Sequence, residues 1–157
     1  MKHNLYNSKF LKTFALSTVL GLSLANTAHA AEALSVNLQA KQIVTENGKQ
    51  VLKTVNRANS GDVIQYQATY RNNLQKPMTN VALTIPVPAS MVYVSSSSPA
   101  PTQASLDGKK FENLPIMRKV NGKMVEVPAS QYRAVRWIVK TLPAQQSATV
   151  SINTKVQ

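Results

Sequence analysis

Residues 60–73, SGDVIQYQATYRNN, alternate between two kinds of side chain, and this alternation decides the fold. The side chains on one side of the extended chain are apolar or aromatic: Ile64, Tyr66, Ala68 and Tyr70. A period of two is typical of a β-strand with one buried face. Gly61 and Asp62 predict a turn before it, capped by the Asp62 side-chain oxygen. We expect Tyr66 and Tyr70 to pack on the core face, with their hydroxyls bonded to backbone groups.

Three further stretches show the same alternation, over residues 34–40, 81–87 and 148–156. Two Asn-Gly pairs, at residues 47–48 and 121–122, lie between strand-like runs. This dipeptide is preferred in the type I′ turn of a tight hairpin, because both of its residues tolerate a positive φ.

No segment of the chain after residue 30 has the helical period that a crossover between parallel strands needs. Several short strands separated by turns therefore predict an all-β, antiparallel β-sandwich, with a closed barrel as the alternative. Pro86 and Pro88 mark the point where one strand leaves its sheet, and Pro99 and Pro101 mark a loop over residues 95–103. We expect the first and last alternating strands to lie at the sheet edges, where they could extend a partner's sheet.

A cleavable signal peptide is predicted over residues 1–30. Three lysines give the start its positive charge: Lys2, Lys9 and Lys12. The uncharged run over residues 13–25 is short for a membrane span, which needs about 20 apolar residues. Ala28 and Ala30 offer the small side chains that a signal peptidase requires, so we expect cleavage after Ala30. An uncleaved N-terminal anchor is the alternative.

Cleavage would leave 127 residues, enough for a single β-sandwich domain over residues 31–157. Both histidines of the chain, His3 and His29, lie in the removed segment, and the chain has no cysteine. Imidazole and thiolate are the usual bases, nucleophiles and transition-metal ligands. We therefore predict no catalytic, cofactor-binding or metal-binding residue and no disulfide.

The composition is strongly basic. Removing the three leader lysines leaves 15 basic and 6 acidic residues, a net charge of +9. A positive surface speeds encounter with polyanions, which outside the cytoplasm include anionic lipids, acidic polysaccharides and acidic proteins. The alternative is that the charge only keeps an exported protein in solution, since the basic residues are spread along the chain.

Three stretches together resemble a known family: residues 60–73, residues 79–98 (TNVALTIPVPASMVYVSSSS) and residues 136–156 (RWIVKTLPAQQSATVSINTKV). The chain is similar over roughly 100 residues to the family named domain of unknown function eleven, a bacterial and archaeal surface-protein repeat. The matching positions are turn and core residues: Gly61, Asp62, Tyr66, Asn72, Val81, Pro88, Tyr93, Val94, Trp137, Leu142 and Val150.

The resemblance implies an immunoglobulin-like fold and a place in the cell envelope, and it implies no general biochemical activity. Trp137, between Val135 and Val139, is expected in the centre of the core. The chain departs from the family in having Ile85 where Asp is frequent and Gln145 where Gly is favoured. It also carries a single copy of a module that usually occurs in tandem.

The segment over residues 107–136 is longer than this family pattern needs. We expect residues 116–127 to form a hairpin around Asn121-Gly122. One face would carry Ile116, Arg118, Val120, Lys123, Val125 and Val127, and the other would carry Met117, Lys119, Met124 and Glu126. The segment holds seven basic residues, which are the candidate partner-binding residues: Lys109, Lys110, Arg118, Lys119, Lys123, Arg133 and Arg136. The alternative is an ordinary solvated hairpin.

These features predict a non-catalytic, exported module of the cell envelope, structural or partner-binding, in the periplasm, on the cell surface or released. Its expected partner is an envelope protein or an anionic envelope polymer or lipid, with no specific nucleic acid and no membrane span after cleavage. The alternative is a carboxylate-dependent glycoside hydrolase, whose acid pair would come from Asp107, Glu112 and Glu126.

Overall fold

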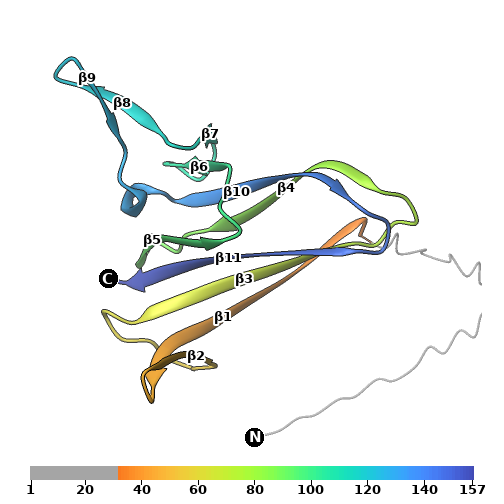
Figure 1. Ribbon diagram of the computed structural model, residues 1–157, viewed down its shortest axis with the longest axis horizontal. Coiled ribbons are helices and arrows are strands. Elements are labelled where there is room, and N and C mark those ends of the chain that lie inside the picture. Colours follow the sequence, from red (N-terminus) through yellow and green to blue (C-terminus); the bar gives the residue numbers. More distant parts are fainter. Residues whose placement is uncertain (1–31) are drawn as a thin grey trace, which may run out of the picture. The chain divides into compact units, whose positions relative to one another are not determined.

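A computed structural model describes residues 32–157, and the predicted signal peptide with its cleavage site lies outside them. The described residues form antiparallel β-structure with one 3-10 turn and no α-helix (Figure 1). None of their helical segments is long and apolar enough to cross a membrane. The strands are β1 (Leu34–Glu46), β2 (Lys49–Lys53), β3 (Val63–Asn72), β4 (Met78–Pro86), β5 (Met91–Ser98), β6 (Gln103–Ser105), β7 (Glu112–Asn113), β8 (Met117–Val120), β9 (Lys123–Glu126), β10 (Ala134–Leu142) and β11 (Ser147–Val156), and the 3-10 turn is η1 (Ala129–Gln131).

The strands form two main sheets and a separate hairpin. One sheet has the order β2-β1-β3-β11-β5, the other has the order β4-β10-β6-β7, and β8 pairs only with β9. The two sheets lie as separate layers in Figure 1, and the hairpin projects beyond them. The all-β, antiparallel prediction is confirmed. Neither sheet closes on itself, so the alternative of a closed barrel is wrong.

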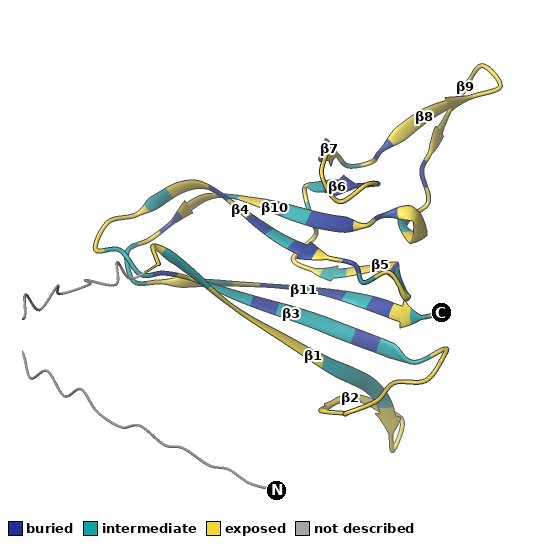
Figure 2. Ribbon diagram, turned by 180° about the vertical axis from the view of Figure 1, so that it is seen from behind, coloured by how far each residue is buried: buried dark blue, intermediate teal, exposed yellow. Residues whose placement is uncertain are grey.

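The core lies between the two sheets and takes one face of each strand, as the alternation predicts (Figure 2). On the first sheet, Ala68 of β3 and Ile152 of β11 are buried. On the second sheet, Leu83 and Ile85 of β4 and Trp137 of β10 are buried as well. Burying each large apolar side chain contributes about 1.5–3 kcal/mol, so this shared face is the main stabilising element.

The predicted edge position of the last strand is wrong. β11 pairs with β3 on one side and with β5 on the other, so its backbone has partners along both edges. A period of two reports which face of a strand is buried and carries no information about its place in the sheet. β1 is closer to the expectation, because β2 pairs only with residues 42–46 and leaves the outer edge of residues 34–41 open.

Both Asn-Gly pairs form the predicted two-residue hairpin turns. The φ angles are 52° and 76° at Asn47 and Gly48, and 49° and 82° at Asn121 and Gly122. The turn before β3 also forms as predicted, since the Asp62 carboxylate accepts a 2.8 Å hydrogen bond from the backbone N–H of Asn59.

The turn before β11 holds Gln145 in a conformation that favours glycine. Gln145 has a φ of 59°, a left-handed conformation that glycine adopts at lower cost. The Gln145 amide donates hydrogen bonds of 2.8 and 3.2 Å to the carbonyls of Asn73 and Leu74. These bonds help to hold the strained residue in place.

The aromatic predictions are confirmed for Tyr70 and Trp137. For Tyr66 the packing against the core is confirmed, and the backbone partner of its hydroxyl is wrong. The Tyr70 hydroxyl donates to the Thr84 carbonyl at 2.6 Å and accepts from its N–H at 3.1 Å, which joins the two sheets. The Trp137 indole is buried and donates to the Pro99 carbonyl at 2.8 Å. The Tyr66 hydroxyl instead meets the Met91 sulfur at 3.4 Å. Residues 95–98 belong to β5, so the proline loop is shorter than predicted.

Asn72, at the end of β3, is the most completely bonded buried polar side chain of the two sheets. Its amide nitrogen donates toward the carbonyls of Lys76, Leu142 and Pro143 at 2.9–3.1 Å. Its amide oxygen accepts from the N–H of Leu74 at 2.9 Å. The side chain is fully buried and ties the β3–β4 connection to the crossover between β10 and β11.

We expect Asn72→Ala to destabilise the protein by about 3 kcal/mol, because it leaves buried backbone groups without partners. Urea denaturation followed by circular dichroism measures the change. Asn37→Ala is the matched control, because Asn37 is exposed on β1, and it should change stability by less than about 0.5 kcal/mol. Equal stability of the two variants would contradict the structural role of Asn72.

Candidate functional site

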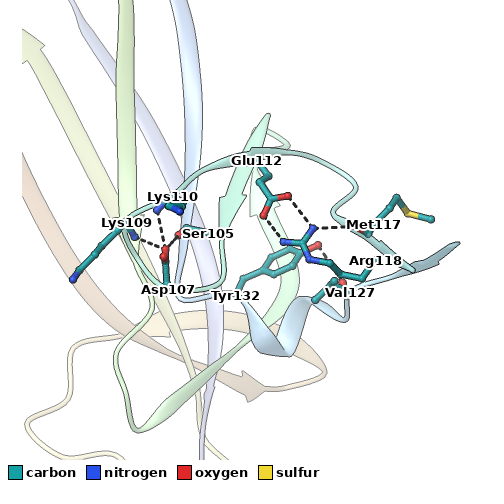
Figure 3. A network of polar contacts seen from close by, with 9 residues as sticks. All are labelled: Ser105, Asp107, Lys109, Lys110, Glu112, Met117, Arg118, Val127 and Tyr132. Atoms are coloured by element: carbon teal, nitrogen blue, oxygen red, sulfur yellow. Dashed lines mark hydrogen bonds and ion pairs between the residues drawn. The ribbon is translucent and has the colours of Figure 1, made fainter. Parts of the chain in front are cut away.

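The seven candidate residues cluster around one end of the second sheet and along the projecting hairpin. Lys109 and Lys110 lie in the β6–β7 connection, where Asp107 fixes the backbone (Figure 3). The Asp107 carboxylate accepts 2.8 Å hydrogen bonds from the N–H groups of Lys109 and Lys110, and a 2.9 Å bond from the Ser105 hydroxyl. The turn therefore presents two adjacent lysine side chains from a fixed backbone.

These hydrogen bonds also change the acidity of Asp107. The N–H groups of Lys110 and Lys109, followed by the Ser105 hydroxyl, lower the pKa of Asp107 from 3.8 to about 2. Each of these donors binds the charged carboxylate more strongly than the neutral acid. Asp107 is therefore ionised throughout the physiological range.

Arg118 of β8 is held by Glu112 of β7. Its guanidinium donates two parallel hydrogen bonds to the carboxylate, one of them 2.9 Å long between Nη1 and Oε2 (Figure 3). Nη1 also donates to the carbonyl of Met117 at 2.9 Å. The hydrogen bond from Arg118 lowers the pKa of Glu112, and Glu112 raises the pKa of Arg118. This two-point geometry fixes the direction of the arginine side chain.

Arg136 lies in β10, and Arg133 directly precedes this strand. Both approach the same region. The Arg133 N–H donates to the carbonyl of Ser105 at 2.7 Å, which places Arg133 beside β6. The Arg136 guanidinium lies 3.4 Å from the centre of the Phe111 ring and donates to the Thr84 hydroxyl at 3.1 Å. Because a cation over an aromatic face is attracted to it, this contact holds Arg136 against the β6–β7 connection.

Lys119 and Lys123 lie on the hairpin, whose predicted faces are confirmed. Opposite residues share a face, and the opposed pairs are Met117 with Glu126, Arg118 with Val125, Lys119 with Met124, and Val120 with Lys123. Ile116 and Val127 are buried at the base, whereas every residue of β8 and β9 is exposed. The hairpin is thus anchored by its base and free along both strands.

The structure brings five of the seven residues together and extends the other two away from them. Lys109, Lys110, Arg118, Arg133 and Arg136 are joined through the β6–β7 connection by the contacts described above, and we call these five residues the basic surface. Phe111 and Glu112 organise this surface, and no local sequence pattern indicates the stacking of Arg136 on Phe111.

The three acids considered for hydrolysis are arranged poorly for acid–base catalysis. Asp107 and Glu112 line one hollow of about 200 Å³ together with Lys110 and Arg118. Both carboxyl groups have a lowered pKa, whereas a general acid at neutral pH needs a raised one. Glu126 lies apart, on a different cleft. Within residues 32–157, no group of three or more acidic or histidine side chains is placed to hold a metal ion.

The cleft that Glu126 lines was not predicted from the sequence. It has a volume of about 560 Å³ and lies between β5, the proline loop, the base of the hairpin and η1. Its residues come from four separate segments: Tyr93, Ser95, Ser96, Ser97, Ala100, Pro101, Leu114, Pro115, Glu126, Ala129 and Tyr132. Only the tertiary fold brings these segments together, so no local pattern in the sequence could indicate the cleft.

No protein-family model matches this chain, and no curated protein or solved structure is significantly similar to it.

The Asp107 contacts predict a distinct pH response. Its pKa is depressed in the folded protein, so its contribution to stability is complete above pH 3.8 and is lost as the pH falls toward 2. We expect the stability difference between the wild type and the Asp107→Asn variant to narrow over this interval in thermal unfolding. Carboxyl-carbon NMR should place the Asp107 midpoint near pH 2, and a midpoint near 3.8 would refute the network.

Proposed function

We propose that this protein is a non-catalytic, exported module of the cell envelope that binds an acidic partner protein. The basic surface and the adjoining hairpin are the proposed binding region. The observation that carries the proposal is that basic side chains are held in fixed positions there, by Glu112 on Arg118 and by Phe111 on Arg136. Positioned charges lose less conformational entropy on binding than free ones.

The hairpin supports a protein partner over a polymer or a lipid. Four apolar side chains are exposed on its two faces: Met117, Val120, Met124 and Val125. Lys119 and Lys123 lie among them. A polyanion would contact only the lysines. A membrane would be entered by the tip of the hairpin, and this tip is the polar pair Asn121-Gly122. A protein surface with acidic and apolar groups would use both kinds of side chain.

The fold supports the envelope assignment. We propose that the two sheets form an immunoglobulin-like sandwich related to the surface-protein repeats of the domain of unknown function eleven family. Supporting features are the buried Trp137 on the second sheet and Asn72 at the end of β3. The arrangement departs from an immunoglobulin domain in one respect, because β11 pairs with β3 and β5 rather than with β10.

Export is proposed on the sequence of residues 1–30. When the full chain is expressed in a bacterial host and recovered outside the cytoplasm, its intact mass should lack these 30 residues. A recovered protein that retains Met1 would refute cleavage after Ala30.

The binding proposal is tested by immobilising the protein and eluting envelope proteins with rising salt. We expect the Lys110→Glu/Lys119→Glu variant to weaken retention of the specific partner about tenfold or more, because both reversals place a negative charge before an acidic surface. The matched control is Lys76→Glu/Lys155→Glu, which makes the same change in net charge at two exposed lysines outside the basic surface and the hairpin.

Retention of one acidic protein by the wild type and the control, with loss in the Lys110/Lys119 variant, would support the proposal. Elution of all bound material at modest salt from all three proteins would refute it. Binding that follows anionic vesicles or acidic polysaccharide instead of a protein would also refute it.

A further inference from the structure

The cleft beside β5 has walls that suit a long, partly apolar ligand. The rings of Tyr93 and Tyr132 stack with their centres 6.2 Å apart and form its inner wall. Their hydroxyls are already bonded, to Ser97 Oγ at 2.9 Å and to the Val127 carbonyl at 3.2 Å. Leucine, alanine and proline side chains supply further apolar lining. A ligand would therefore contact aromatic and aliphatic groups as well as the three serines of β5.

Glu126 is the exception in this lining. It is exposed at the end of β9, and no described basic side chain lies within ion-pair distance of it. Burial raises the pKa of the Tyr132 hydroxyl, and the charge of the nearby Glu126 carboxylate raises it further. Four of the other five carboxylates in residues 32–157 have partners, in the pairs Glu46 with Lys53, Asp62 with Asn59, Asp107 with Lys109 and Lys110, and Glu112 with Arg118. Glu32, the fifth, is exposed at the start of the described residues.

Glu126 thus has no ion-pair partner among the described residues, although 15 basic residues follow residue 30. Because it lines a cleft together with leucine, alanine and proline side chains, it offers a site for a cation on an apolar stem. Lysine and arginine side chains have this form, with a methylene stem that packs on apolar groups and a charged end that remains polar.

The cleft also runs along a free strand edge. β5 is the last strand of its sheet, so its outer backbone groups have no strand partner there. Ser95, Ser96 and Ser97 all line the cleft, although consecutive side chains of a strand point to opposite faces. β5 is an edge strand and its regular alternation is also broken here, and both features let three consecutive residues reach one cleft.

A bulge distorts β5 at the same place. Asn153 of β11 lies opposite Ser96, and Thr154 lies opposite Tyr93, so Val94 and Ser95 have no opposed residues. Ser95 has a φ of 58°, a costly conformation for a residue other than glycine. Bulges are frequent where a strand edge is shaped for binding.

We propose that this cleft binds an extended peptide segment carrying a lysine or arginine, whose backbone adds to the free edge of β5 and whose cationic side chain reaches Glu126. Edge addition gives affinity through main-chain hydrogen bonds, and the pocket for one side chain gives specificity. The site is separate from the basic surface and from the acidic partner proposed above.

NMR titration of the full chain with a defined probe, the peptide acetyl-Ser-Val-Lys-Val-Ser-amide, tests the site. We expect the amide signals of Ser95, Ser96 and Ser97 to shift on addition. The norleucine peptide has the same stem without the ammonium group and should bind about tenfold more weakly. Methylation of the peptide backbone nitrogens should abolish the shifts, because it removes the donors needed for edge pairing.

Glu126→Gln should remove the preference for lysine over norleucine, because it keeps the shape of the side chain without its charge. Glu46→Gln makes the same charge change on β1 and should leave the preference intact. The proposal is overturned if the serine amides do not shift at several millimolar peptide, if both peptides bind wild type equally, or if n-butylammonium alone binds as well as the peptide.

Discussion

The amide of Asn72 fixes the point where the chain passes from one sheet to the other. It bonds to the carbonyls of Leu142, at the end of β10, and of Pro143, in the turn that follows. β11 can therefore begin beside β3 and insert between β3 and β5. Because β5 is then the outermost strand, the position of the cleft and the open strand edge both depend on this crossover. An apolar side chain or a carboxylate has no donor for these carbonyls, and a lysine or arginine has no acceptor for the Leu74 N–H that Asn72 also binds.

The local features of this fold could be predicted because each depends on only a few neighbouring residues. Alternation assigned Ile64 and Ala68 to the core face, and the Asn-Gly dipeptides placed both tight turns. Sheet order could not be predicted in the same way, because the partners of β11 are more than 50 residues away along the chain in the opposed pairs with β3 and β5. Pairing at that separation is decided by the whole core, and no local pattern reports it.

The same distinction holds for the candidate sites. The seven basic residues were visible in the sequence, and so was the hairpin that carries Lys119 and Lys123. The groups that organise them were not, since Phe111 meets Arg136 only after β6 and β10 have paired. The cleft was hidden for a stronger reason. In the sequence Glu126 is one of several acids, and only the fold places it in the lining of the cleft, without an ion-pair partner among the described residues.

A cation site on a chain with a net charge of +12, of which +9 belongs to residues 31–157, requires the local charge to outweigh the total. The screening length at physiological ionic strength is about 8 Å, so a ligand inside the cleft responds mainly to the groups that line it. Glu126 is the only charged residue among them. The distant positive charge still slows the approach of a uniformly basic peptide. The cleft should therefore favour a segment in which one basic residue lies among neutral or acidic ones. Such a segment is compatible with a partner protein whose acidic surface is attracted by the basic hairpin.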